Sequence, residues 1–444
     1  VTLLFSDYER GRYLRLLQQA RWQGGNRLEQ KLARSAAKGL LEAHFDADLL
    51  GGEEPAFDTF AYQTETGGIA YLPYADTDLH LTATALDLAP ASFDGYAAEK
   101  YLRVILESDS ESRERKLAAL YGLAALNRPV LMEAQNLLEL KDLGLMEQLY
   151  LALAVAELGD LEGARPLYQA IITEHGEALG ADARIKTGRD QGEILTHTAL
   201  AGMLAAKLGA AEAPAFAGYL LTNWDSEVLL ALEQAILVSD GLPRLSDQPV
   251  AVTYAVDGQE TKAELKPGQV KSLTLTAKQA ASLQVKDVQG KVGLTAIYEA
   301  PLTRGELKQR EGFSVARTYS VVGGASRANT FRVGDLVKVT LDVRIPGTAP
   351  AGAYELSDYL PSGLRMVAKP WQQGIKWGGG NDPAWPLAVD GQKATFWVGR
   401  DSYPVSYYAR VVTAGTYTAE EPVLQNGKSG LIYAFGQRAQ VKIE

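Results

Sequence analysis

The first half of the chain consists of short segments in which apolar residues recur at the spacing of an α-helix. Residues 145–158, LMEQLYLALAVAEL, are apolar nearly all round, and this pattern predicts a helix that is buried on every side. Turn residues such as Gly159-Asp160 and Gly180 separate the segments, as is typical of antiparallel helix pairs. Helices are predicted over residues 113–126, 131–142, 145–158, 161–175, 193–208 and 227–238.

The period of the pattern changes after Pro243. Residues 249–256, PVAVTYAV, alternate between two faces and are rich in β-branched and aromatic side chains, which predicts a strand. Strands of this kind are predicted over residues 249–256, 270–276, 292–298, 335–345 and 405–412. Turns are predicted at Asp257-Gly258, Pro267-Gly268 and Asn426-Gly427. We therefore expect predominantly helix before Pro243 and predominantly strand after Leu245.

A second break is predicted at residues 302–311, LTRGELKQRE, which form a polar stretch between two strand-rich regions. The chain is then expected to contain three domains. They are a helical domain over residues 1–243, a small β module over residues 244–303 and a larger β-sandwich over residues 304–444. All three sizes are ordinary for protein domains.

The composition narrows the classes of function. Hydrophobic residues make up 46% and charged residues 22% of the chain, which is the balance of a globular protein. No stretch approaches the roughly 20 consecutive apolar residues of a membrane span. A net charge of −10 without any basic run argues against a nucleic-acid partner. The chain has no cysteine, which excludes disulfides, thiol nucleophiles and thiolate metal sites. Because the chain begins at Val1 without a signal-type segment, we expect it to be a piece or a matured product of a longer protein.

Many short antiparallel helices, together with Thr66-Gly67-Gly68, Tyr71-Leu72-Pro73 and Leu81-Thr82-Ala83, resemble an α/α-toroid. That architecture serves terpene cyclases, prenyltransferases and the thioester domains of complement and macroglobulin proteins. These families carry different chemistry, so the site residues must decide between them.

The terpene cyclase and prenyltransferase hypotheses both depend on a short acidic segment. Asp76-Thr77-Asp78 is similar to the protonation motif of terpene cyclases, but an acidic helix start that caps backbone N–H groups explains it more simply. A prenyltransferase zinc site needs a cysteine, which the chain lacks, and only Asp76, Asp78 and His80 have a spacing that could hold zinc. The remaining histidines are scattered along the chain at His44, His175 and His197. We expect no catalytic residue, no metal and no cofactor, and a toroid-type enzyme is the third alternative.

A motif near the start of the chain favours the thioester domains. These domains carry Gly-Cys-x-Glu-Gln just before a toroid helix, and here Gly24-Gly25-Asn26-Arg27-Leu28-Glu29-Gln30 runs into a helix-like segment. Leu28, Glu29 and Gln30 match the bacterial form of the motif, whereas Arg27 stands at the position of the cysteine. An internal thioester joins the cysteine sulfur to the glutamine side chain. The resemblance therefore implies a degenerate site without covalent chemistry.

The strand-rich half resembles the C-terminal domain of the same family. Arg317-Thr318-Tyr319 is similar to its Arg-x-Tyr strand, Gly334-Asp335 to its Gly-Asp strand start, and Asp358-Tyr359-Leu360-Pro361-Ser362-Gly363 to its Asp-x-Leu-Pro-x-Gly turn. Tyr408-Ala409-Arg410 and Gly415-Thr416-Tyr417 are similar to the closing motifs. In this order and spacing, the motifs identify the chain as similar to the C-terminal part of bacterial alpha-2-macroglobulin-like proteins.

The resemblance implies a fold and a function. The fold is an α/α-toroid followed by macroglobulin-like β-sandwich domains, and the toroid is inserted into a β domain, so the strand-like run of residues 1–5, VTLLF, should lead toward the β module around residues 250–298. The implied function is non-catalytic protease entrapment by a protein that is extracellular, at the cell surface or periplasmic. The implied partners are proteases or other proteins, including upstream macroglobulin domains of the same chain. The alternative is a surface binding or adhesion module that uses the toroid face or a Trp-rich loop.

That loop holds four of the six tryptophans of the chain, Trp371, Trp377, Trp385 and Trp397, in a stretch rich in Gly and Pro. The favoured interpretation is that the indoles anchor a long loop on the β-sandwich. The alternative is an exposed aromatic platform that binds a sugar or a protein partner.

Overall fold

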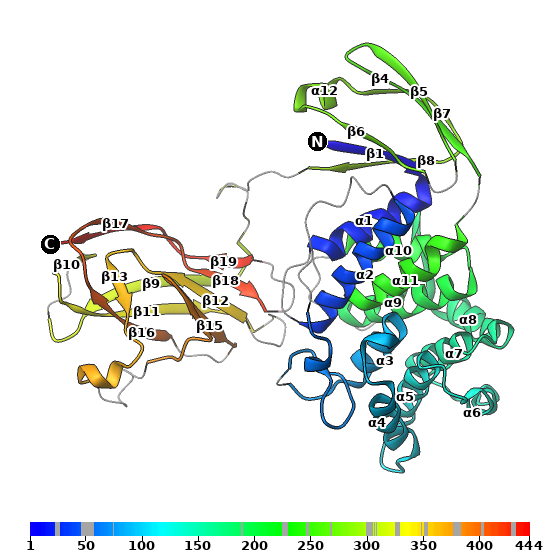
Figure 1. Ribbon diagram of the computed structural model, residues 1–444, viewed down its shortest axis with the longest axis horizontal. Helices are drawn as coiled ribbons and strands as arrows, with labels where there is room; N and C mark the ends of the chain where they lie inside the picture. Colours follow the sequence, from blue (N-terminus) through cyan, green and yellow to red (C-terminus); the bar gives the residue numbers. More distant parts are fainter. Residues whose placement is uncertain are drawn as a thin grey trace. The chain divides into compact units, whose positions relative to one another are not determined.

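The computed structural model describes residues 1–22, 27–45, 57–73, 75–187, 190–223, 230–245, 248–266, 269–298, 305, 307, 309–324, 329–347, 349, 354–375, 383–400, 404–427 and 432–444. Contacts divide the chain into two compact units, Val1–Ala300 and Pro301–Glu444. The first unit contains the helices and small sheets, and the second contains further β-sheets (Figure 1).

Most of the first unit is helical, as the apolar pattern predicts. The helices are α1 (Tyr8–Trp22), α2 (Leu28–His44), α3 (Leu79–Leu88), α4 (Gly95–Glu107), α5 (Arg113–Ala125), α6 (Leu131–Leu137), α7 (Leu145–Glu157), α8 (Leu161–His175), α9 (Gln191–Leu208), α10 (Ala213–Thr222) and α11 (Ala231–Gly241). Helix α6 is shorter than the predicted segment 131–142, because residues 139–142 are all exposed and no packing stabilises a longer helix there.

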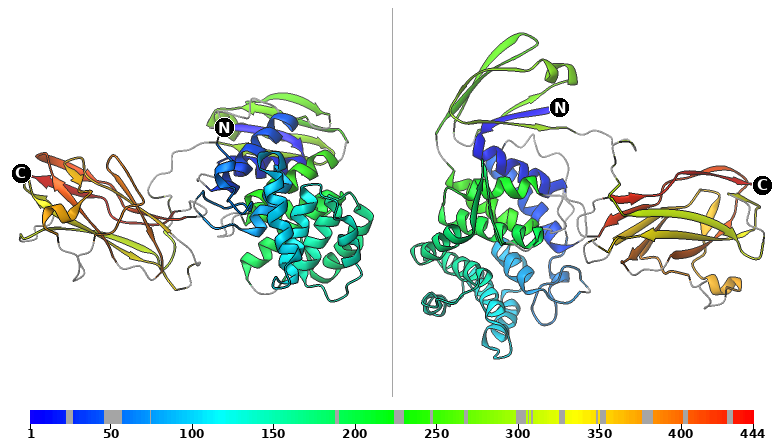
Figure 2. Two further views of the ribbon diagram at one scale, coloured as in Figure 1. Left: turned by 60° about the horizontal axis from the view of Figure 1, so that its bottom comes forward. Right: turned by 180° about the vertical axis from the view of Figure 1, so that it is seen from behind.

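The helices form an inner ring and an outer layer. Each of α2, α3, α5, α7, α9 and α11 packs against the next, and α11 packs back on α2, which closes a circuit. Helices α1, α4, α6, α8 and α10 pack against members of this circuit from the outside. Figure 2 shows the helices and sheets from two further sides. The predicted α/α-toroid is therefore confirmed. The inner helices tolerate burial all round because they are rich in Ala and Leu, and residues 149–156 of α7 are all buried.

Small residues allow the inner helices to approach closely. A Cβ atom added to Gly202 of α9 would lie 2.5 Å from a terminal carbon of Leu237 on α11 and 3.3 Å from the Cβ of Phe216 on α10. Because glycine has only a hydrogen atom as its side chain, α9 can pack closely against both α10 and α11 at this position.

A small β-sandwich adjoins the helices within the first unit. One sheet has the order β6-β1-β8 and the other β5-β4-β7. Their bounds are β1 (Thr2–Asp7), β4 (Val250–Val256), β5 (Gln259–Leu265), β6 (Lys271–Thr274), β7 (Gln284–Gln289) and β8 (Val292–Ile297). The predicted turn at Asp257-Gly258 joins β4 to β5 with φ of 50° and 81°, the left-handed region that a two-residue hairpin turn requires.

The N-terminal strand belongs to this β module, as the resemblance implies. Strand β1 lies between β6 and β8 and pairs with both in antiparallel fashion. The two faces of β1 pack into different hydrophobic cores. Leu4 packs into the helical core, whereas Phe5 packs into the core of the β module and stacks on Tyr254 with ring centroids 5.2 Å apart. The strand therefore joins the module as predicted and also contacts the helices.

The second unit is a β-sandwich. One sheet has the order β13-β16-β11-β9, a second β14-β15-β12-β18-β19, and a small third sheet β10-β20-β17. Their bounds are β9 (Ser314–Val321), β10 (Thr330–Phe331), β11 (Leu336–Arg344), β12 (Tyr354–Tyr359), β13 (Leu364–Met366), β14 (Ala388–Asp390), β15 (Lys393–Val398), β16 (Val405–Val411), β17 (Gly415–Ala419), β18 (Val423–Asn426), β19 (Ile432–Phe435) and β20 (Ala439–Ile443). Inward-facing residues such as Val339, Leu356 and Tyr407 form its core.

The change from helix to strand after Pro243 is confirmed, and so are the helices and strands predicted on either side of it. Two small elements depart from the pattern: the hairpin of β2 (Gly176–Leu179) and β3 (Asp182–Ile185), and the short helix α12 (Ala277–Ser282). The start of the last predicted helix, residues 227–229, and the turn Pro267-Gly268 lie outside the described residues. Among the described helices, none combines the length and the apolar character that crossing a membrane requires.

Candidate functional site

The degenerate motif lies at the N-terminal end of α2. Arg27 is the residue just before the helix, and Leu28, Glu29 and Gln30 form its buried first turn. The Leu28 N–H donates to the carbonyl of Tyr71 at 2.9 Å, and the Arg27 N–H donates to Gln30 Oε1 at 3.2 Å. The four consecutive residues of the motif thus form the start of α2. The preceding residues Gly24-Gly25-Asn26 lie outside the described part of the chain.

Arg27 neutralises a buried carboxylate. Its guanidinium forms an ion pair with Glu29 and lies over the ring of Tyr71, 4.1 Å from the centroid. The Glu29 side chain is only 5% exposed, and its second oxygen has no hydrogen-bond partner among the described residues. Burial raises the pKa of Glu29, although Arg27 opposes this shift. The residue that the resemblance places at the position of the thiol is therefore a cation that pairs with a carboxylate in the first turn of α2.

A second set of polar residues lies at the same end of the inner ring. His80 of α3 places Nε2 2.6 Å from Glu233 Oε1 of α11 and Nδ1 2.9 Å from the hydroxyl of Tyr150 of α7. Burial lowers the pKa of His80, but the hydrogen bond and charge of Glu233 outweigh it, so the net shift is upward. Nothing in the spacing of Tyr150 and Glu233 points to this contact, because the ring closure alone brings them to His80.

The acidic segment beside His80 has a structural role. Asp78 precedes α3, and its carboxylate accepts the Leu81 N–H at 2.8 Å. Asp76 is exposed. Within the described ranges, no three His, Asp or Glu side chains converge in a way that could hold a metal ion. The helix cap explains Asp78 without enzyme chemistry.

A buried ionic network lies at the opposite end of the same ring. Lys207 Nζ near the end of α9 lies 3.1 Å from Asp87 Oδ1, 2.5 Å from Glu157 Oε2 and 3.0 Å from Asp240 Oδ2. These carboxylates lie near the ends of α3, α7 and α11. Burial raises the pKa of Glu157 and of Asp240, and Lys207 opposes both shifts. One lysine thus joins four inner helices.

The two clusters follow the helix dipoles. Glu29 and Glu233 lie in the first turns of α2 and α11, where the partial positive charge of a helix favours an anion. Lys207 lies where several helices end and their partial negative charges favour a cation. The inner helices therefore present their N-terminal ends, with the degenerate motif, on one face of the toroid.

Residues from the different sequence motifs of the β-sandwich contact one another. Arg317 of β9 and Asp358 of β12 form a buried ion pair of 2.5 Å, and the Tyr407 hydroxyl donates to the other Asp358 oxygen at 2.7 Å. The Arg410 guanidinium donates to the carbonyl of Gly334 at 2.7 Å. A Cβ on Gly363 would lie 2.4 Å from a ring carbon of Tyr417. Residues far apart in the sequence thus form pairs that hold the sandwich together.

The three described tryptophans of the Trp-rich stretch are exposed rather than buried. Trp371 and Trp385 are 41% and 61% exposed, and their ring centroids lie 5.7 Å apart. Trp397 lies on β15 and is 44% exposed, and Trp377 lies outside the described residues. The interpretation of the described indoles as buried anchors is therefore wrong. Tyr408 of the neighbouring strand β16 is by contrast only 2% exposed.

Comparison with known proteins shows which solved structures have a similar fold. No family model matches the chain, and no curated protein matches it in sequence. The structure is similar to native alpha-2-macroglobulin from Escherichia coli spanning domain MG7 to the C-terminus, with a TM-score of 0.66 and 18% identity, covering 100% of this chain and 77% of that one. It is also similar to native E. coli alpha-2-macroglobulin, with a TM-score of 0.64 and 18% identity, and to Salmonella alpha-2-macroglobulin reacted with methylamine, with a TM-score of 0.60 and 17% identity.

The comparisons with native E. coli alpha-2-macroglobulin and with the Salmonella protein cover 100% of this chain and 31% of each of those chains. The similarity thus includes the helical region and the antiparallel sheets that follow it. The chain has the fold of the C-terminal part of bacterial alpha-2-macroglobulins.

Proposed function

We propose that this chain is the non-catalytic C-terminal part of a secreted or surface-located bacterial alpha-2-macroglobulin-like protein that restrains proteases physically. Its parts would be the toroid of residues 1–243, the β module of residues 244–303 completed by β1, and the terminal sandwich of residues 304–444. The full-chain similarity in fold supports this assignment. Because the chain spans only 31% of two of these similar proteins, the restraint itself would involve upstream macroglobulin domains.

The observation that carries the proposal is the environment of Arg27. A thioester requires a thiol beside the amide of the glutamine, and the chain contains no cysteine. The residue in its place is a guanidinium, which stays protonated at neutral pH and is therefore no acyl acceptor. Its ion pair with Glu29 and its position over Tyr71 give it a structural role instead. Gln30 is then an ordinary side-chain amide, and a protease would be held without a covalent bond.

Methylamine tests the absence of covalent chemistry, since it attacks a thioester and leaves a mass increase on the glutamine. We expect the intact mass of the 444-residue chain to stay unchanged after incubation. A mass gain mapped to Gln30, or a covalent adduct with a protease under denaturing conditions, would overturn this part of the proposal.

Substrate size tests the entrapment. We expect the longer protein that contains this chain to block digestion of a large protein substrate by a bound protease while cleavage of a small peptide substrate continues. An enclosed protease still admits small molecules. Equal loss of both activities would indicate blockage of the active site, and loss of neither would indicate that proteases are not its partners.

A surface binding module is the second candidate function. It is favoured by the exposed pair Trp371 and Trp385, because large aromatic side chains left at a surface often mark interaction sites.

A further inference from the structure

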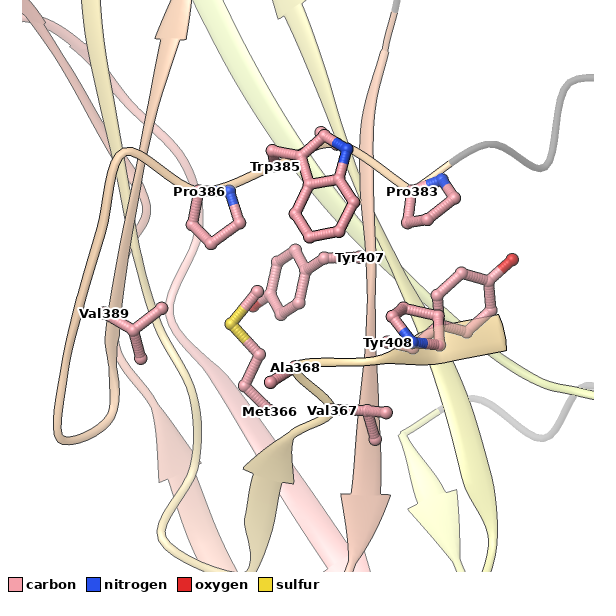
Figure 3. Close-up of a pocket in the computed structure, with 11 residues that line it drawn as sticks. Met366, Val367, Ala368, Pro383, Trp385, Pro386, Val389, Tyr407 and Tyr408 are labelled. Atoms are coloured by element: carbon pink, nitrogen blue, oxygen red, sulfur yellow. The ribbon is translucent and has the colours of Figure 1, made fainter. Parts of the chain in front are cut away.

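An apolar pocket of about 300 Å³ lies beside this tryptophan pair on the sandwich. Met366, Ala384, Trp385, Val389 and Tyr407 line it, and Figure 3 shows the indole of Trp385 over the ring of Tyr407. The volume is at the lower end of the range for ligand sites in proteins and suits one large side chain. Nothing in the proposed protease restraint requires this pocket.

The pocket stays open because of the sheet topology. Strand β13 is the last strand of one sheet and β14 the last strand of the other, so no further described strand covers this side of the sandwich. The backbone on both sides is held by β16: the Val367 N–H donates to the Tyr408 carbonyl at 2.8 Å, and the Ala384 N–H donates to the Ser406 carbonyl at 2.7 Å. The pocket is thus preformed.

The lining selects an apolar ligand group. It consists of Met, Val, Ala, Pro, Trp and Tyr residues, and no charged or amide side chain of the described residues contributes to it. The hydroxyl of Tyr407 already donates to Asp358. A sugar would find few hydrogen-bond partners here, whereas an aliphatic or aromatic side chain would be well matched.

The apolar surface extends beyond the pocket. Trp371 lies next to Trp385, while Leu387 and Val389 are 50% and 51% exposed. This surface is larger than the pocket opening itself. An extended peptide that places one side chain in the pocket and crosses the neighbouring surface would cover both.

The charge of the surroundings indicates the rest of the ligand. Arg365 and Lys369 are exposed beside the lining residues Met366 and Pro370, and neither forms an ion pair with a described residue. The unit from residue 301 onward has 17 Lys and Arg against 12 Asp and Glu, a net charge of +5. The first unit, with 27 against 42, has a net charge of −15. Among the described residues next to the lining, the exposed cations Arg365 and Lys369 outnumber the one exposed carboxylate, Asp390, which follows Val389. The pocket therefore lies on the basic unit of an acidic chain, which favours carboxylates of the ligand near Arg365 and Lys369.

We propose that this pocket binds an acidic extended segment of a partner protein, with one large apolar side chain in the pocket and carboxylates of the segment near Arg365 and Lys369. Extended peptides bind at exposed sheet edges in this way, with main-chain hydrogen bonds for affinity and side-chain pockets for specificity.

A random peptide library panned against the immobilised 444-residue chain tests the proposal. We expect enrichment of peptides that carry Leu, Met, Phe or Trp next to Asp or Glu. The consensus peptide is then synthesised, and its affinity is measured by calorimetry for the unaltered chain and for variants. Trp385→Ala and the double variant Arg365→Glu/Lys369→Glu should each weaken binding by about tenfold or more.

Trp397→Ala is the matched control, since Trp397 is similarly exposed but does not line the pocket. It should leave the affinity unchanged, and thermal melting should show that Trp385→Ala is as stable as the unaltered chain. The proposal is overturned if no peptide is enriched, if the enriched peptides lack acidic residues, or if Trp397→Ala weakens binding as much as Trp385→Ala. If an enriched peptide is displaced by decanoate, both occupy the same pocket and the proposal is supported; if decanoate binds and no peptide is enriched, the pocket belongs to a lipid chain and the proposal is overturned.

Discussion

Single charged residues stabilise both ends of the toroid. At one end Arg27 faces Glu29, and at the other Lys207 faces three carboxylates, while helix dipoles favour the sign of charge found at each end. A buried ion pair contributes little net stability when intact, but loss of one partner leaves a buried charge without compensation. Within the toroid, substitution of either cation should therefore have a large effect on stability.

Arg27→Ala should lower the free energy of unfolding of the helical region by about 2–4 kcal/mol, because Glu29 would stay buried without its counter-charge. Urea denaturation followed by circular dichroism at the helical minimum measures this change. The double variant Arg27→Ala/Glu29→Gln removes both charges and should recover more than half of the loss. A double variant less stable than Arg27→Ala would contradict the role assigned to Arg27.

Lys207→Met should lower the free energy of unfolding by about 3–5 kcal/mol at pH 7, since Lys207 is the cation for three carboxylates. The loss should shrink as the pH falls. Burial raises the pKa of Glu157 and of Asp240, and removal of Lys207 raises them further. Carboxyls with a raised pKa in the folded state bind protons more readily when folded, so protonation favours folding below that raised pKa.

Denaturation of Lys207→Met and of the unaltered chain at pH 7 and pH 5 measures this difference. Lys262→Met, which removes an exposed lysine paired with Glu264, should leave the stability unchanged at both values. A deficit for Lys207→Met that stays constant or grows toward pH 5 would show that the carboxylates of the network are not the cause.

At the scale of elements, the most consequential strand is the first. Strand β1 lies in the middle of its sheet, although β6 and β8 follow it by more than 250 residues. The helices therefore form an insertion between the first and the later strands of one β module. Because Leu4 and Phe5 enter different cores, β1 also couples the module to the helices.

Leu4→Pro should disrupt the sheet on both sides of β1. Proline cannot donate a ladder hydrogen bond, and the substitution also removes a buried side chain from the helical core. Hydrogen exchange should show joint loss of protection at Leu273 of β6 and Ala296 of β8, which are both register partners of Leu3. Val1→Pro, before the strand, serves as the control. Loss confined to β1 would contradict the central position of this strand.

At the scale of the whole molecule, the chain consists of two compact units with separate cores. The helical core and the core of the sandwich share no residue, so each unit buries its own apolar surface. The units also differ in net charge, at −15 and +5.

The second unit should fold when residues 301–444 are expressed alone. This unit contains the buried pair Arg317 and Asp358 and all lining residues of the apolar pocket. We expect cooperative thermal unfolding, a strand-type circular dichroism spectrum and retention on a cation exchanger at pH 7. A fragment that melts without cooperativity would show that its core is incomplete without the first unit.

The sequence by itself determined the elements and the class of the molecule. The change of apolar period at Pro243 predicted helices before and strands after it. Buried faces of helices and strands require apolar residues at different, characteristic intervals along the chain. The motif Leu28-Glu29-Gln30 with Arg27 in front could be recognised as a candidate site, since these residues are neighbours in the chain. The sandwich motifs were recognisable for the same reason.

Only the tertiary structure decided which distant residues meet. The contacts of His80 with Glu233 and of Lys207 with Asp87 arise from closure of a ring of helices, and no local spacing encodes that closure. The exposure of Trp371 and Trp385 was likewise decided by topology. A tryptophan-rich segment has the same composition whether it packs inward or outward, and the end of both sheets at β13 and β14 leaves it at the surface.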